Sequence, residues 1–72
     1  MKLYFNKNFY NSEGIKSSIS AFEDEKLAEF EMVEKDEEFE VKIKNIKDEV
    51  KDILEDEFYN YVLVESRRRM RG

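Results

Sequence analysis

The sequence predicts a single small α+β domain in which a three-stranded antiparallel sheet carries two helices on one face. Three observations support this fold class. The chain has 72 residues, which is enough for one domain, 1–72. Apolar residues alternate along three segments, 2–6, 28–34 and 39–45, as in strands with one buried face. They recur at helical spacing along two others, 13–23 and 47–68.

The first strand and first helix are expected in the N-terminal third of the chain. Leu3 and Phe5 fall on one face of a strand over 2–6. A loop then leads to Ser12, which is a good helix N-cap residue. The following helix, over 13–23, has apolar residues at helical spacing but also contains Gly14 and three serines, which are poor residues for a helix interior.

The middle of the chain predicts an antiparallel hairpin. Strand 28–34 and strand 39–45 both alternate, and a polar turn without glycine joins them. The outer face of the sheet is expected to be polar and to face water. It would carry Tyr4, Glu29, Glu31, Val33, Glu40, Lys42 and Lys44.

The second helix is predicted over 47–68, with one apolar stripe of Ile46, Val50, Ile53, Leu54, Phe58, Tyr61 and Val62. A right-handed crossover puts the first helix on one face of the sheet, and the hairpin returns the third strand beside the first. The expected order of strands is therefore 1-3-2. This is a split βαβ arrangement that lacks its last strand.

Composition excludes most kinds of chemistry. The chain has no Cys and no His, so thiol nucleophiles, disulfides and imidazole acid–base catalysis are absent. It also has no glycine-rich phosphate loop, and its acidic pairs lack the spacing of a calcium loop. We therefore predict a protein that is not an enzyme and binds no metal or cofactor. With no apolar run of membrane-spanning length and no secretory signal, a cytoplasmic location is expected.

Charge is distributed unevenly along the chain, whose net charge is −5. Ten of the 18 acids lie between Glu23 and Glu40, whereas every arginine lies in a basic C-terminal tail, 67–72. This tail could bind phosphate through Arg67, Arg68, Arg69 and Arg71. Alternatively, the arginines could face only the C-terminal carbonyls of the helix and bind no ligand. Nucleic acid is not expected as a partner, because the rest of the chain is acidic and would repel it.

The end of the second helix is apolar almost all round, which indicates burial on more than one side. A homodimer could cover it through Tyr59, Leu63 and their neighbour Tyr61. Alternatively, Phe9, Tyr10 and the first helix of the same chain could cover it.

The first strand is expected at an edge of the sheet, where its unpaired N–H and C=O groups could accept an extended peptide. Tyr4, Phe9 and Tyr10 would then supply aromatic contacts. A second copy of the chain could pair with the same edge instead.

The segment EFYNYVLVE, residues 57–65, resembles the signature Leu-Leu-Asn-Asp-Tyr-x-Leu-Arg-Glu of the small HxsD proteins of His-Xaa-Ser peptide systems. Tyr61, Leu63 and Glu65 match it directly. Tyr59 stands where the signature has Asn, Asn60 where it has Asp, and Val64 where it has Arg.

The opening of the chain, LYFNKNFYNSEGIKSSISAF, also resembles the start of the HxsD family. The resemblance implies an accessory protein that assists radical-SAM enzymes in modifying a precursor peptide. It implies no catalytic residue. The two partners it implies are the precursor peptide and the maturation enzyme.

Overall fold

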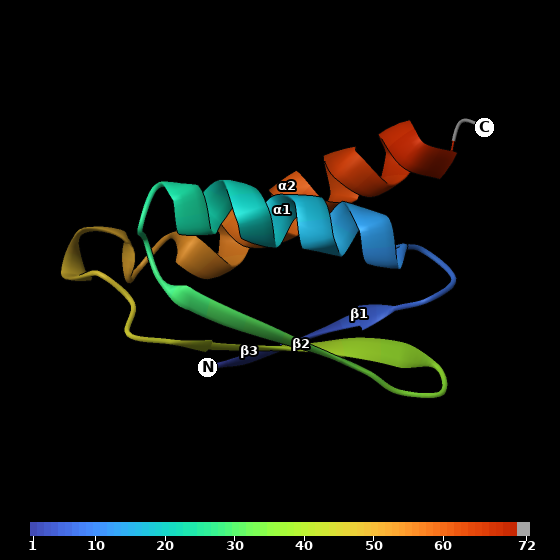
Figure 1. Cartoon of the computed structure of the whole chain (residues 1–72), viewed down its shortest axis with the longest axis horizontal. Coiled ribbons are helices and arrows are strands. Elements are labelled where there is room, and N and C mark those ends of the chain that lie inside the picture. The colour runs from blue at the N-terminus through green and yellow to red at the C-terminus, as the bar shows by residue number, and fades with distance from the viewer. Residues whose placement is uncertain (71–72) are drawn as a thin grey trace.

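The alternating apolar segments form one sheet, and both helices pack on the same face of it, which gives two layers (Figure 1). The computed structural model describes the backbone of residues 1–70 and the side chains of residues 1–68. In chain order the elements are β1 (Lys2–Asn6), α1 (Ser12–Asp24), β2 (Glu29–Glu34), β3 (Glu38–Lys44), the 3-10 helix η1 (Asp48–Val50) and α2 (Leu54–Met70).

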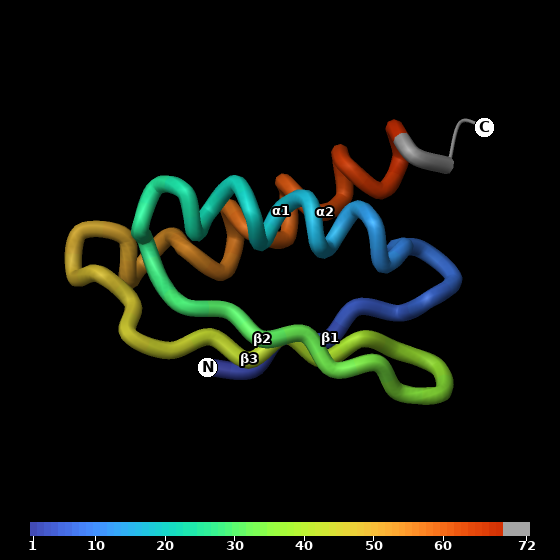
Figure 2. The backbone as a smooth tube through the Cα atoms, in the orientation of Figure 1, coloured from blue at the N-terminus to red at the C-terminus, as the bar shows by residue number. Residues whose placement is uncertain are grey.

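Strand β3 lies in the centre of the sheet and runs antiparallel to both neighbours, in the order β1-β3-β2 (Figure 2). Leu3 lies opposite Val41 on one side, and Phe30 lies opposite Ile43 on the other. The α+β class, the 1-3-2 order and the placement of both helices on one face confirm the prediction. The three strands agree with their predicted bounds to within one residue.

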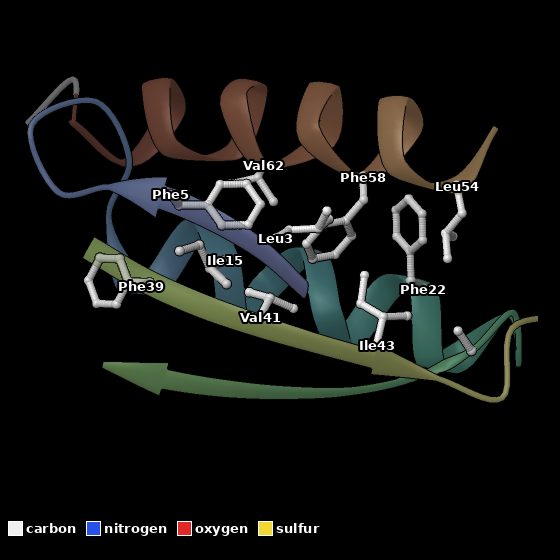
Figure 3. Packing of buried hydrophobic residues seen from close by; sticks show 11 residues of the cluster. Leu3, Phe5, Ile15, Phe22, Phe39, Val41, Ile43, Leu54, Phe58 and Val62 are labelled. Atoms are coloured by element: carbon white, nitrogen blue, oxygen red, sulfur yellow. The ribbon is translucent and has the colours of Figure 1, made fainter. Parts of the chain in front are cut away.

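The core lies between the sheet and the two helices, and side chains of both layers point toward one another there (Figure 3). Aromatic rings dominate it. The Phe22 ring meets the Phe58 ring edge-on, with centroids 5.2 Å apart, and Phe58 meets Phe5 in the same way at 5.9 Å. Edge-to-face pairs of this kind stabilise a core beyond the area they bury. The buried apolar residues are Leu3, Phe5, Ile15, Phe22, Ala28, Phe39, Val41, Ile43, Leu54, Phe58 and Val62.

Helix α1 begins one residue earlier than predicted. Its N-cap is Asn11, whose Oδ1 accepts the N–H of Gly14 at 2.7 Å, and Ser12 is already helical. At the other end Lys26 has φ 58°, and two bonds, Lys26 N–H to Glu23 O and Leu27 N–H to Phe22 O, form a Schellman motif. This left-handed residue turns the chain from α1 toward β2.

The glycine and serines that weaken α1 as an isolated helix lie where α1 meets α2. A Cβ on Gly14 would lie 2.9 Å from both the Cα and the N of Ser66, so only glycine permits this approach of the two backbones. Ser18 is fully buried beside it and donates its hydroxyl to the Gly14 carbonyl at 2.8 Å. The small residues are therefore packing residues of the helix pair.

The predicted second helix begins too early. Residues 47–53 form the 3-10 helix η1 and adjoining turns, and α2 starts at Leu54. The N–H of Lys47 is held by the carbonyl of Leu27 at 3.0 Å, and the N–H of Ile53 bonds three residues back, to Val50. Bonds of that span wind the chain more tightly than an α-helix does. As a result Ile53, expected in the buried stripe, is 52% exposed.

Candidate functional site

The two edges of the sheet differ in how many of their backbone groups are bonded. The hydrogen-bond pattern between the strands shows which N–H and C=O groups each edge presents. Met1 and Ile43 exchange both of their hydrogen bonds, at 2.8 and 3.0 Å. In an antiparallel pair such exchange recurs at every second residue, so Leu3 and Phe5 also bond to β3. The N–H and C=O groups that face away from β3 belong to Lys2, Tyr4 and Asn6.

A tyrosine side chain closes the middle of the β1 edge. The hydroxyl of Tyr59, on α2, accepts the N–H of Tyr4 at 3.2 Å and donates to the C=O of Tyr4 at 3.2 Å. The Tyr59 ring also packs on Phe5, with centroids 4.7 Å apart. The chain thus occupies the central backbone groups of this edge with its own side chain.

The loop after β1 closes the C-terminal end of the same edge. The carbonyl of Asn6 accepts the N–H groups of both Phe9 and Tyr10, at 3.1 and 3.0 Å. The Tyr10 ring then packs edge-on against Phe5 at 5.1 Å. Within the described chain, the outward groups of β1 that keep no partner are the N–H and C=O of Lys2 and the N–H of Asn6.

The outer edge of β2 is open by comparison. Lys35 donates its N–H to the carbonyl of Glu38 at 2.9 Å. Because residues that bond to the partner strand alternate with residues that face away, Glu29, Glu31 and Val33 also bond to β3. The outward residues are Phe30, Met32 and Glu34. The carboxylate of Glu23, on α1, accepts the Phe30 N–H at 3.3 Å. No group within the described residues bonds the outward N–H and C=O groups of Met32 and Glu34.

Carboxylates surround this open edge. Glu34 lies 2.9 Å from the Lys7 ammonium, whose hydrogen bond and charge hold the pKa of Glu34 below its usual value. Glu29 accepts a bond from the Asn45 amide at 2.8 Å. Glu31 is exposed and has no hydrogen-bond or ion-pair partner in the described chain. With Glu23, the edge carries four acidic side chains.

The side of the β2 edge that faces the helices is apolar. Phe30 and Met32 are half-buried and pack against the core, as does Ile19 of α1. The Phe30 ring stacks on Phe58, with centroids 5.0 Å apart and planes 24° apart. The edge therefore has glutamates opposite lysines of β3 on its polar face, and a partly exposed apolar surface on its helix face.

The polar face of the sheet contains one buried acid, contrary to the expectation that Glu40 would face water. Glu40 is only 4% exposed, because Tyr4, Lys2 and Lys35 cover it. Desolvation opposes its ionisation, but the Lys35 charge, the Tyr4 hydroxyl bond and the Lys2 charge outweigh this and lower the pKa of Glu40.

The structure brings together some of the predicted partner-binding residues and separates others. Tyr4, Tyr10 and Tyr59 gather around β1, and Tyr4 is 47% exposed. Phe9 projects from the loop and is 65% exposed. Leu63 is half-buried, and Tyr61 lies on another flank of α2, with its ring edge-on to Phe22 at 5.5 Å.

The basic tail is only partly described. Arg67 and Arg68 are exposed, and Arg68 donates to the Glu65 carboxylate at 3.1 Å. Glu65 also accepts the Ser17 hydroxyl at 2.9 Å, so it ties α1 to α2. The Arg69 side chain and Arg71 lie outside the described residues.

The β2 edge is the surface that sequence reasoning missed. The predicted 1-3-2 order already placed β2 at an edge, which was the available signal, but β1 was predicted as the binding edge because only Lys2 guards it. In the described part of the chain no group of three or more acidic side chains is placed to hold a metal ion. No helix within residues 1–70 is long and apolar enough to cross a membrane. Comparison with protein-family models, with curated proteins and with solved structures found no match.

Proposed function

We propose that the protein is a non-catalytic cytoplasmic adaptor that binds an extended peptide or protein segment as an added strand along β2. The observation that carries this proposal is the contrast between the edges: Tyr59 occupies the central backbone groups of β1, whereas those of Met32 and Glu34 have no partner in the described chain. The resemblance to HxsD proteins supports an accessory role in peptide modification.

Main-chain bonds would supply the affinity. An added strand can donate to the carbonyls of Phe30, Met32 and Glu34, and it can accept from the N–H groups of Met32 and Glu34. Each such bond contributes about 1 kcal/mol net. An incoming carbonyl can also replace the Glu23 carboxylate on the Phe30 N–H, because that bond, at 3.3 Å, is long. This is the strand-addition mode of peptide recognition.

Side-chain chemistry selects the kind of segment. Residues of an added strand alternate between the polar face, beside Glu29 and Glu31, and the helix face, beside Phe30 and Met32. A segment in which basic and apolar residues alternate satisfies both faces. A second copy of β2 would instead bring two rows of glutamates together, and like charges across a strand pair are destabilising.

A titration of the full chain with a short synthetic peptide of alternating lysine and valine tests the proposal. We expect the amide NMR signals of Met32 and Glu34 to shift more than those of Leu3 and Tyr4. A peptide of alternating glutamate and valine is the matched probe and should bind much more weakly. Shifts confined to β1 or to α2 would overturn the proposal.

Two pairs of variants distinguish the contribution of backbone hydrogen bonds to binding from that of side-chain charge. Met32→Pro removes an outward N–H without breaking a bond to β3, and should abolish binding, whereas Lys2→Pro on the β1 edge should not. Glu31→Lys should weaken binding several-fold, while Glu49→Lys, in the 3-10 helix η1 and outside the sheet, should leave it unchanged. Equal binding by Glu31→Lys and the unaltered chain would also count against the proposal.

A further inference from the structure

Helix α2 presents an exposed stripe in which an acid, an aromatic residue, an aliphatic residue and a base follow one another. The stripe consists of Glu57, Tyr61, Val64 and Arg68, which are separated by four, three and four residues and therefore lie on one helix face. Tyr61 is 41% and Val64 is 55% exposed. All four line the same shallow hollow on the surface, together with Asn60 and Glu65.

The order of these residues makes the stripe complementary to itself. When two copies of α2 run antiparallel about a two-fold axis between Tyr61 and Val64, Glu57 lies opposite the partner's Arg68. Tyr61 lies opposite the partner's Val64. Each contact occurs twice, as a two-fold interface requires. We propose that a second copy of the chain is the occupant of this stripe, through antiparallel α2 helices.

Charge complementarity supports a second copy and also sets the direction. The first turn of α2 is acidic, with Glu55, Asp56 and Glu57, and its other end carries the exposed Arg67 and Arg68. Antiparallel packing places each acidic end beside the partner's basic end, and it also aligns the helix dipoles favourably. Parallel packing would place like charges together.

The contacts that the stripe residues make within one chain leave them accessible to a partner. Tyr61 rests edge-on against Phe22, which fixes its ring in place. Arg68 is bonded to Glu65, but its guanidinium has five donors, so it can also reach the partner's Glu57. Tyr59, by contrast, already packs inside the chain, so the dimer expected at Tyr59 and Leu63 is better placed on this other face of α2.

Sedimentation of charge-reversal variants tests the proposal. Glu57→Arg alone sets arginine against the partner's Arg68 twice, and Arg68→Glu alone sets glutamate against the partner's Glu57 twice. We expect each variant to weaken dimerisation about tenfold or more, because juxtaposed like charges are costly. An equimolar mixture of the two variants restores both opposite-charge contacts and should dimerise as the unaltered chain does.

A control variant and three results make the test decisive. Asp52→Arg reverses a charge outside the stripe and should leave dimerisation unchanged. A strictly monomeric unaltered chain at NMR concentrations would overturn the proposal. So would single variants that dimerise like the unaltered chain, or a mixture that stays monomeric. Because the stripe contains no residue of the β2 edge, this result is independent of peptide binding.

Discussion

The phenol oxygen of Tyr59 lies 3.2 Å from both the amide nitrogen and the carbonyl oxygen of Tyr4, which is 55 residues away in the chain. One hydroxyl thereby satisfies the two backbone groups that an added strand would use at the centre of β1. The tyrosine ring rests on Phe5, so packing holds the hydroxyl at the edge.

Replacing Tyr59 by phenylalanine should therefore destabilise the fold and expose the β1 edge. We expect a loss of about 1 kcal/mol in the free energy of unfolding, since water replaces the lost bonds only in part. Urea denaturation measures that loss, and hydrogen exchange at the Tyr4 amide should accelerate. Tyr61→Phe is the matched control, because no group in the described chain bonds the Tyr61 hydroxyl. Equal effects of the two substitutions would contradict this role of Tyr59.

Replacing Gly14 by alanine should destabilise the protein although alanine favours helices. The new methyl group would lie 2.9 Å from the backbone of Ser66, and backbone atoms cannot move aside as a side chain does. We expect a cost of about 1–3 kcal/mol from overpacking. Ser20→Ala, at an exposed position of the same helix, should leave stability unchanged or raise it by about 0.5 kcal/mol. Thermal denaturation would distinguish the two, and a stable Gly14→Ala variant would disprove the close approach of α1 and α2.

Replacing Lys26 by glycine should stabilise the protein. Lys26 has φ 58°, a conformation that is strained for a residue with a Cβ and natural for glycine. After the greater entropy of glycine in the unfolded chain is subtracted, we expect a gain of about 0.5 kcal/mol. The control is Lys16→Gly within α1, which should cost about 1 kcal/mol. A lower urea midpoint for Lys26→Gly would contradict the prediction.

Replacing Glu40 by glutamine should flatten the dependence of stability on acid pH. Because the folded state lowers the pKa of Glu40 below 4.5, this carboxylate contributes stability above that pH and loses it as pH falls through the folded-state value. The variant should therefore be less stable than the unaltered chain at neutral pH, and the two should converge in acid. Urea titrations across the acidic range measure this, with Glu31→Gln as the control. Parallel curves for Glu40→Gln and the unaltered chain would show that the Lys2 and Lys35 contacts are not stabilising.

The strands could be predicted because their pattern follows from one physical requirement. A strand with one buried face must alternate, and Phe39, Val41 and Ile43 do so without interruption. The start of α2 could not be predicted in the same way. Apolar residues at Ile46, Val50 and Ile53 fit both an α-helix and a tighter 3-10 turn, and the bond from Lys47 to Leu27 that decides between them joins distant parts of the chain.

The candidate site was less predictable than the fold, because it depends on which side chains reach which edge. Sequence spacing placed Tyr59 on a helix flank, but its bonds to Tyr4 follow from how α2 lies over β1. The burial of Glu40 likewise depends on two lysines from other parts of the chain. Gly14 and Ser18 look like weak helix residues until α2 is placed against them.

The inequality of the two edges also limits the size of any assembly that grows by strand pairing. A sheet that is open on both sides can pair head to tail without end, which is how fibres form. Here the Tyr59 hydroxyl and the loop after Asn6 block one side, so the β2 edge of one copy finds no complementary β1 edge on the next. Growth by strand pairing would therefore stop after one added strand. The Tyr59 hydroxyl thus restricts strand pairing to the β2 edge, and one open edge is compatible with a small complex of fixed stoichiometry.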